Sequence, residues 1–258
     1  MKNQIFTIFS ASVFLFKICN AQVIDTVKFT FNFKNQSLPV AIINFNDSKV
    51  PKEKIPMLLF LHGAGERGID NEIQLKGGIP SIVKILKSEK YGSFIMVAPQ
   101  CPKDQKWVTT DWTLSAHQME DQMSWPLAAT VALLDSILNA NKQIDQSRLY
   151  LSGLSMGGFG TWELLQRFPD KFTAAIPVCG GGDTSLACRI SKVPVWAFHG
   201  KKDKVVLVNR TTDMVSKMKL LNKNVKMTIF PNDGHYIWKK VYENKGVIRW
   251  FFSKRKIQ

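Results

Sequence analysis

One serine of the chain stands in a pattern typical of a nucleophile. Gly153-Leu154-Ser155-Met156-Gly157 matches G-x-S-x-G, in which a strand turns sharply into a helix and the serine at the apex has strained backbone angles. Glycines on either side of the serine let the strand and the helix approach closely, and the helix N-terminus favours developing negative charge. Because the pattern also occurs by chance, Ser155 needs partners elsewhere in the chain.

A serine hydroxyl needs a neighbouring base, and the base needs a group that orients it. Behind a G-x-S-x-G turn these partners follow in the order Ser, then Asp or Glu, then His, at the carboxyl ends of strands. Asp203 comes just after an apolar strand predicted over 193–198, and His235 just after one predicted over 225–230. We therefore predict a catalytic triad of Ser155, Asp203 and His235.

Other side chains compete for these roles. Asp183 follows the preceding strand and is the alternative acid, whereas Asp233 stands too near the predicted base in sequence to orient it easily. Chain order excludes His117 as the base and leaves it a role in substrate binding. His62 and His199 each precede a glycine at a strand end, where an imidazole more often fixes a turn.

A carbonyl group under attack by serine also needs two backbone donors for its oxyanion. One is expected to be the N–H of Met156, the residue after the nucleophile, and the other an N–H from the loop after the strand over 57–61. His62-Gly63-Ala64-Gly65 occupies that loop. Ala64 is the preferred donor and Gly65 the second choice, although these glycines also suit a tight turn.

A long polar loop over 103–125 carries Trp107, Trp112, Trp125 and His117. It leaves a predicted strand at its carboxyl end, the side on which open α/β sheets bind ligands. The tryptophans are candidates for an aromatic wall that contacts a ring of the substrate. Alternatively, Trp107 and Trp125 pack the loop onto the core. No large helical cap is inserted, so we expect an open site.

Predicted strands alternate with predicted helices along most of the chain. This order indicates an α/β fold: a mostly parallel sheet with helices on both faces, preceded by antiparallel N-terminal strands, in one domain over 22–258. The predicted strands are two within 25–45, then 57–61, 94–98, 149–151, 172–178, 193–198 and 225–230. The predicted helices cover 73–88, 126–140, 157–167, 205–221 and 241–254.

The N-terminus has the pattern of a secretory signal peptide over 1–21. Lys2 precedes an apolar run over 5–16, and Cys19-Asn20-Ala21 resembles a cleavage site. No later stretch is apolar enough for a membrane helix, so we expect an exported, soluble protein or a periplasmic one. The net charge of +15 comes from scattered lysines without a basic stripe, which argues against a nucleic-acid partner.

Three cysteines remain after the predicted cleavage: Cys101, Cys179 and Cys188. Cys179 and Cys188 flank a glycine-rich loop and are the expected disulfide pair in an oxidising compartment. The alternative is three small buried side chains.

Several motifs together resemble a known family. They are His62-Gly63-Ala64-Gly65-Glu66-Arg67-Gly68, Pro99-Gln100-Cys101-Pro102, the stretch 153–162, Cys179-Gly180-Gly181-Gly182-Asp183, His199-Gly200-x-x-Asp203 and Gly234-His235-x-x-Trp238. Over about 58–250 the chain resembles secreted α/β-hydrolases of the phospholipase/carboxylesterase ("predicted peptidase") type, which are similar to feruloyl and acetyl-xylan esterases. The resemblance implies Ser155 as nucleophile, Asp203 as acid, His235 as base, and neither metal nor cofactor.

The predicted activity is therefore that of a secreted serine carboxylesterase acting on carboxylic esters, including acyl, feruloyl or acetyl esters on plant polysaccharides. A serine peptidase of the prolyl-oligopeptidase type would use the same triad, but the chain lacks the length for a gating domain. The third possibility is a hydrolase-fold binding protein without catalysis, which the full set of site residues disfavours.

Overall fold

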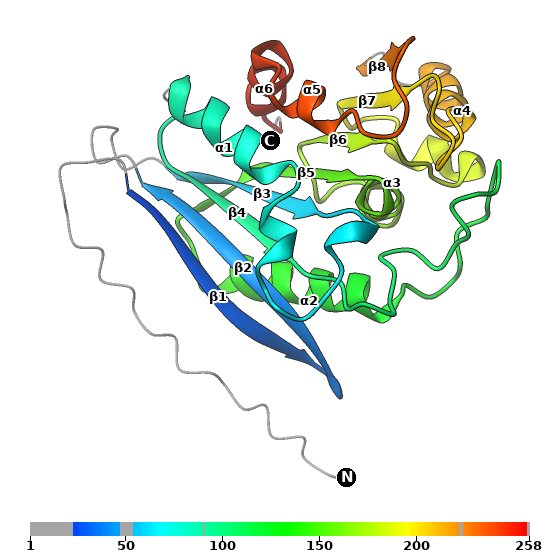
Figure 1. The fold of residues 1–258 in the computed structure, drawn as a ribbon. Helices are drawn as coiled ribbons and strands as arrows, with labels where there is room; N and C mark the ends of the chain where they lie inside the picture. The colour runs from blue at the N-terminus through cyan, green and yellow to red at the C-terminus, as the bar shows by residue number, and fades with distance from the viewer. Residues whose placement is uncertain (1–22, 47–53, 90, 222–223, 257–258) are drawn as a thin grey trace.

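An eight-stranded sheet runs through the computed structural model, which describes residues 23–46, 54–89, 91–221 and 224–256 (Figure 1). Its strands lie in the order β1-β2-β4-β3-β5-β6-β7-β8. Their bounds are β1 Val23–Phe33, β2 Gln36–Asn46, β3 Ile55–Leu61, β4 Phe94–Pro99, β5 Ile144–Leu154, β6 Ala174–Val178, β7 Val195–Gly200 and β8 Val225–Phe230.

The sheet combines an antiparallel edge with a parallel centre. β1 pairs antiparallel with β2, and β2 pairs antiparallel with β4. From β4 to β8 every pairing is parallel, so the carboxyl ends of these strands meet at one edge of the sheet. This is the expected fold class of a mostly parallel sheet with antiparallel N-terminal strands.

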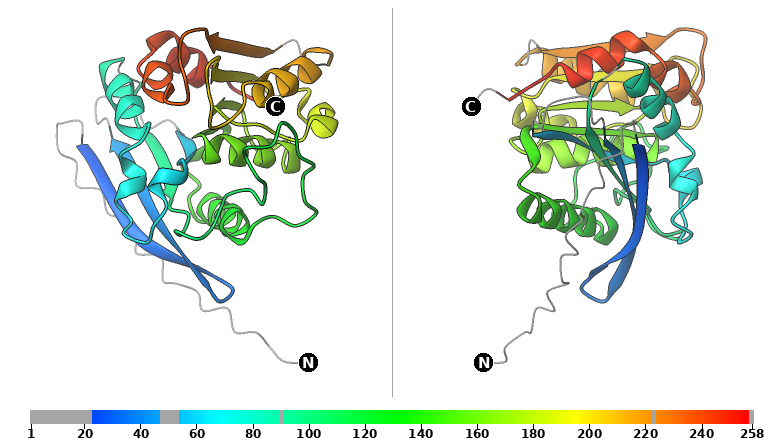
Figure 2. Two further views of the ribbon diagram at one scale, coloured as in Figure 1. Left: turned by 45° about the vertical axis from the view of Figure 1, so that its right-hand side comes forward. Right: turned by 90° about the vertical axis from the view of Figure 1, so that its left-hand side faces the viewer.

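Helices cover both faces, as the right-hand view of Figure 2 shows for α2 and α6. One core joins the sheet to α2, α3 and α4, and the other joins it to α1, α5 and α6. Alternate residues of β3 enter the two cores, Leu59 on one side and Leu58 on the other, as the two-residue period of a strand requires. The helices are α1 Ile79–Ser88, α2 Trp125–Ala140, α3 Met156–Arg167, α4 Asn209–Lys219, α5 Trp238–Tyr242 and α6 Lys245–Phe252, with short 3-10 turns η1 Ala64–Glu66, η2 Ile73–Leu75 and η3 Thr184–Ile190.

The helix predicted over 73–88 is wrong in its first part. η2 ends at Leu75, and α1 begins only at Ile79, after Gly77 and Gly78. Glycine disfavours a continuous helix, and here it also allows close packing. A Cβ atom on Gly78 would lie 2.4 Å from the Tyr242 ring of α5.

Two further predicted helices are shorter than expected, for reasons that lie in side-chain hydrogen bonds. α4 begins at Asn209 rather than 205, because the N–H groups of Val205 and Val206 donate to Asp203 Oδ1 at 2.8 and 2.9 Å. The helix predicted over 241–254 is divided into α5 and α6. Asn244 begins α6 as an N-cap, with Oδ1 accepting from Gly246 N at 2.9 Å.

The predicted signal peptide over 1–21 lies outside the described residues. Among the residues that are described, no helix combines the length and the apolar composition needed to cross a membrane.

Candidate active site

Ser155 occupies the sharp turn between β5 and α3. Its backbone has φ 53° and ψ −117°, a conformation that costs free energy for a residue with a side chain. The turn is held by a hydrogen bond from Ser155 N to Val178 O at 2.8 Å. The serine is half-buried, so part of the residue is exposed to solvent.

The two glycines of the motif are required by close backbone contacts. A Cβ atom on Gly153 would lie 2.3 Å from Gly157 O, and one on Gly157 would lie 2.0 Å from Leu61 O. These distances are far below van der Waals contact, so only glycine allows β5, α3 and the end of β3 to meet in this way.

His235 lies between Ser155 and Asp203. Its Nε2 is 2.8 Å from Ser155 Oγ, and its Nδ1 is 2.7 Å from Asp203 Oδ2. Ser155 follows the carboxyl end of β5, Asp203 that of β7 and His235 that of β8. With Nδ1 donating to the carboxylate, Nε2 has its lone pair directed at the serine hydroxyl, the arrangement that a general base needs.

Four hydrogen bonds hold the Asp203 carboxylate. Oδ1 accepts from the backbone of Val205 and Val206, and Oδ2 faces both His235 Nδ1 and His199 Nε2, the latter at 3.1 Å. Burial by itself would raise the pKa of Asp203, but the hydrogen bonds from His199, His235 and Val206 outweigh it and hold the pKa well below its usual range. Asp203 is therefore an anion with its orientation fixed.

The alternative acids lie in other environments. Asp183 caps η3, with Oδ1 accepting from Ser185 N and Oδ2 from Met119 N, both at 2.9 Å. Asp233 is paired with Lys240. Neither the Asp183 nor the Asp233 carboxylate contacts the imidazole of His235.

Backbone donors face the same end of the sheet. Met156 is the first residue of α3, and Ala64 and Gly65 belong to η1, directly after β3. Among the described residues, no group accepts a hydrogen bond from the N–H of Met156 or of Ala64. Both donors are thus available to an oxygen atom of a ligand.

His62 fixes the loop that carries Ala64. Its Nδ1 lies 2.6 Å from Gly63 O, and its Nε2 accepts a hydrogen bond from Cys101 N at 2.9 Å. Because Nε2 accepts, the ring is neutral and carries its proton on Nδ1. Burial lowers the pKa of His62 to about 4, which keeps it neutral and ties the end of β3 to the end of β4.

Trp107 was predicted as a substrate contact, and this is wrong. The side chain is fully buried; its Nε1–H donates to His62 O at 3.0 Å, and its ring centroid lies 5.2 Å from that of His62. Trp107 therefore supports the β3 loop from within the core, as the packing alternative expected.

The other aromatic candidates lie on or near the same loop. Trp125 is the first residue of α2 and is partly buried against the core, and Trp112 lies under Lys106 Nζ, 4.6 Å from its ring centroid. No ring contact or hydrogen bond joins either tryptophan to Ser155 or His235 within the described residues. Their role in substrate binding remains a prediction.

His117 is half-buried and is held by Arg210. Its Nδ1 accepts from Arg210 Nη2, and its ring centroid lies 6.0 Å from that of Phe159, one helical turn after Ser155. Burial and the neighbouring guanidinium lower the pKa of His117 to about 4. His117 thus contacts Arg210 of α4 and Phe159 of α3 rather than the His235–Asp203 pair.

The structure adds an aromatic group that sequence reasoning missed. Tyr236 is 80% exposed, and its ring lies 5.7 Å from His235 and 4.9 Å from Trp238, between centroids. Trp238 itself lies 5.8 Å from the His235 ring. The motif Gly234-His235-x-x-Trp238 contained this signal, but only the fold shows that both rings border the base.

The expected disulfide is wrong, because Cys101, Cys179 and Cys188 are all free thiols. Cys188 is exposed on η3, whereas Cys179 is buried and its Sγ donates to His235 O at 3.3 Å. The two side chains therefore point to different environments despite their short separation in sequence.

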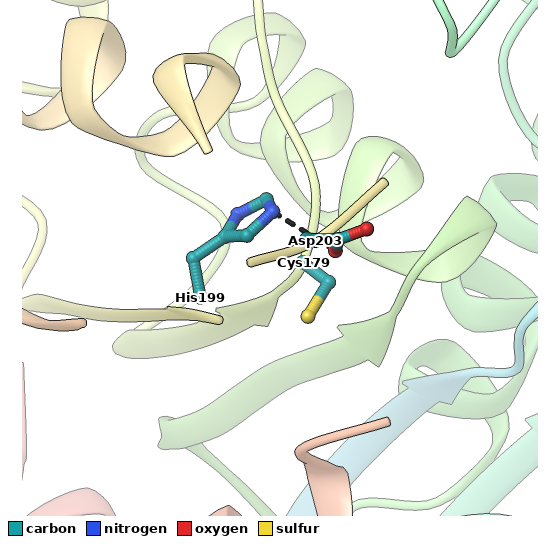
Figure 3. Close-up of side chains that lie close together, drawn as sticks. All are labelled: Cys179, His199 and Asp203. Atoms are coloured by element: carbon teal, nitrogen blue, oxygen red, sulfur yellow. Dashed lines mark ion pairs between the residues drawn. The ribbon is translucent and has the colours of Figure 1, made fainter. Parts of the chain in front are cut away.

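Cys179, His199 and Asp203 lie together in the interior, with one donor atom of each within 4.8 Å of the others (Figure 3). Metals use these residue types, but here every atom already has a hydrogen-bond partner, and burial raises the pKa of the Cys179 thiol. A cation in this space would have to break the His199–Asp203 contact. Cys179, His199 and Asp203 therefore form a hydrogen-bonded cluster that includes the predicted acid, Asp203.

Comparison with known proteins gives a family. The profile of the dienelactone hydrolase family matches residues 97–243. A bifunctional acetylxylan esterase/xylanase of Neocallimastix patriciarum is 28% identical over 163 residues, which cover 58% of this chain and 20% of that protein. The chain spans only 11% to 20% of the length of the curated relatives it matches.

Solved structures share the architecture. A thermostable esterase superposes with a TM-score of 0.78 at 33% identity, covering 90% of this chain and 64% of that one. An acylaminoacyl peptidase of Pyrococcus horikoshii gives 0.64 at 17% identity, covering 92% of this chain and 43% of that one. A ferulic acid esterase gives 0.63 at 17% identity over 90% and 100% of the two chains. The expected α/β-hydrolase fold is confirmed.

Proposed function

The chain belongs to the dienelactone hydrolase family, and on that premise we propose that it is a serine hydrolase that cleaves carboxylic esters through an acyl-enzyme. The observation that carries this proposal is the continuous contact from Ser155 Oγ through His235 to Asp203, at 2.8 and 2.7 Å. Ser155 is the nucleophile, His235 the general base and Asp203 the acid that orients it.

In the first half of the reaction, His235 Nε2 takes the Ser155 proton while Oγ attacks the ester carbonyl. The tetrahedral oxyanion accepts hydrogen bonds from the N–H groups of Met156 and Ala64, with Gly65 as the alternative donor. The carbon–oxygen bond to the alcohol then breaks, and His235 gives its proton to the leaving oxygen. The acyl group remains on Ser155.

In the second half, water replaces the alcohol. His235 removes a proton from the water, whose oxygen attacks the acyl carbonyl, and the same backbone donors hold the oxyanion. Collapse of this intermediate releases the carboxylic acid and returns the proton to Ser155. Asp203 stays ionised throughout and stabilises the imidazolium form of His235 at both stages.

The proposed substrates are acetyl, feruloyl or other acyl esters attached to plant polysaccharides. The acetylxylan esterase relative and the ferulic acid esterase fold support this substrate class. Tyr236 and Trp238 beside His235 offer aromatic surface to a phenolic or sugar ring. A secreted or periplasmic location, with cleavage near Ala21 leaving a hydrolase domain over 22–258, belongs to the same proposal and is tested by N-terminal sequencing of the exported protein.

Labelling with a fluorophosphonate, together with turnover of p-nitrophenyl acetate, tests the nucleophile. Wild type is expected to label and turn over, and Ser155→Ala to lose both, with turnover reduced by at least about a thousandfold. Ser136→Ala is the matched control, because its hydroxyl is exposed on α2 and, among the described residues, bonds only to Ala132 O. Equal labelling of wild type and Ser155→Ala contradicts the assignment.

A substrate panel separates esterase from peptidase. Methyl ferulate, acetylated xylan, long-chain p-nitrophenyl esters and dipeptide anilides are compared by kcat/KM. Preference for the first two supports the proposal. Preference for anilides identifies a peptidase, and preference for long chains contradicts a carbohydrate-linked ester.

A further inference from the structure

His199 lies next to the predicted triad without belonging to it. The side chain is fully buried at the end of β7, and its ring points toward Asp203 (Figure 3). Asp203 Oδ2 is thus shared by two imidazoles, His235 Nδ1 at 2.7 Å and His199 Nε2 at 3.1 Å.

The partners of His199 Nε2 can only accept hydrogen bonds. One is the Val206 carbonyl at 2.9 Å, and the other is the Asp203 carboxylate. A ring nitrogen between a carbonyl oxygen and a carboxylate oxygen must carry a proton, which it shares between the two acceptors.

The partner of His199 Nδ1 also acts as an acceptor. Nδ1 lies 2.8 Å from Thr211 Oγ1, and that hydroxyl donates its single proton to Gly180 O at 2.8 Å. Among the described residues, no other group donates to the buried Gly180 carbonyl, so the hydroxyl cannot turn toward the ring without leaving that oxygen unpaired. Thr211 therefore presents a lone pair to Nδ1, and Nδ1 carries a proton as well.

We propose that His199 is a doubly protonated, positively charged positioning residue that anchors Asp203 and weakens proton binding at His235. The consequence of this charge for catalysis rests on the proposed function. A buried charge is tolerated only when it is paired and hydrogen-bonded, and here Asp203 provides the counter-charge. The cation offsets part of the carboxylate's negative charge, so His235 binds its proton less tightly than a histidine–aspartate pair alone would allow.

Few other titratable groups face this cluster. Around His199 they are Asp203 and Cys179, and burial raises the pKa of that thiol, so it stays neutral. On the His235 loop, Asp233 is engaged with Lys240, and the Tyr236 ring lies 5.7 Å from that of His235. Near Cys179, burial raises the pKa of Tyr242, and a phenol is neutral near pH 7. The charge balance at the base is therefore set by Asp203 and His199.

The protonation state can be measured directly in the intact protein. In ¹⁵N-histidine-labelled protein at pH 7 to 8, both ring nitrogens of His199 are expected to show a directly bonded proton, assigned by their loss in His199→Gln or His199→Asn. His62 is the internal control, since its Nε2 accepts from Cys101 N and must be bare. A single bonded proton on His199 overturns the proposal.

A second experiment changes the charge of His199 by substituting its hydrogen-bond partner Thr211. Thr211→Val keeps the shape but removes the acceptor for Nδ1–H, whereas Thr211→Ser keeps it. In Thr211→Val, His199 is expected to become neutral, and the acid limb of kcat/KM to move up by about one pH unit, because His235 then holds its proton more tightly. Thr211→Ser is expected to keep the wild-type profile.

The shape of the pH profile of kcat/KM distinguishes a change in the charge of His199 from a change in packing. A purely structural effect lowers kcat/KM by the same factor at every pH, and this result in Thr211→Val overturns the proposal. The nitrogen measurement needs no turnover, so it decides the charge of His199 even if Ser155→Ala proves active. An active Ser155→Ala variant would contradict the proposed function but would not affect the conclusion about the charge of His199.

Discussion

A Cβ atom on Gly157 would lie only 2.0 Å from the carbonyl oxygen of Leu61, at the end of the neighbouring strand β3. This approach brings the start of α3, which carries Met156, beside the loop that carries Ala64. The second glycine of G-x-S-x-G is therefore the place where the nucleophile turn and the predicted oxyanion loop are joined.

We expect Gly157→Ala to destabilise the protein by about 1–3 kcal/mol or more, because the added methyl group must push the two backbones apart. Urea unfolding followed by circular dichroism measures this loss. Gly65→Ala is the stability control, since its Cβ meets nothing within 4 Å. Equal losses in the two variants would show that the close contact is relieved at little cost.

Asp203→Asn is expected to lower kcat by roughly a thousand- to ten-thousandfold with the fold intact. The amide cannot stabilise the imidazolium form of His235, and it favours the wrong tautomer. Steady-state turnover of p-nitrophenyl acetate measures the effect. Asp183→Asn, the alternative acid in the sequence, caps η3 and is expected to keep kcat within about twofold; a large loss there would revive it as the acid.

Stability should fall as the pH drops from about 6.5 to about 4, because His62 is buried neutral. Its pKa is about 4 in the folded chain, against 6.5 ordinarily. Over that window the unfolded chain binds a proton that the folded chain excludes, so the free energy of unfolding falls with pH by on the order of 3 kcal/mol.

Urea unfolding of wild type and His62→Gln at pH 7.5, 6 and 5 checks this pH dependence. The variant is expected to be less stable at pH 7.5 but to have a shallower slope. An unchanged slope would mean that other groups, such as His117 with its pKa also near 4, cause the loss.

Trp107→Ala should act on stability rather than on substrate affinity. The side chain is fully buried and holds His62 O through Nε1–H, so its removal is expected to cost about 3–5 kcal/mol. Trp107→Phe keeps most of the volume and loses only the hydrogen bond. Thermal unfolding and KM for methyl ferulate are measured together, and a rise in KM at unchanged stability would restore the predicted substrate role.

The thiols should differ sharply in reactivity. Burial raises the pKa of Cys101 to about 12 and also raises that of Cys179, whereas Cys188 is exposed. Iodoacetamide at pH 8, followed by peptide mass spectrometry, is expected to modify Cys188 at least about a hundredfold faster than the other two. A disulfide-linked peptide that contains Cys179 and Cys188 would contradict the structure.

The sequence by itself determined the features that depend on local pattern and chain order. G-x-S-x-G predicted the turn at Ser155, because its glycines and apolar strand are encoded within a dozen residues. Apolar runs predicted the end of β8 and, to within two residues, the end of β7. In a parallel sheet those ends share one edge, so the sequence alone points to Asp203 and His235. The alternating strands and helices predicted the fold class by the same reasoning.

Only the tertiary structure decided which side chains meet behind that edge. The sequence indicates only a turn residue at His199, since nothing near it in sequence shows that its ring reaches both Asp203 and Thr211. Trp107 is buried because His62, 45 residues earlier in the chain, offers it an acceptor. Such contacts depend on side-chain directions across elements distant in sequence, which are set by packing and not by local pattern.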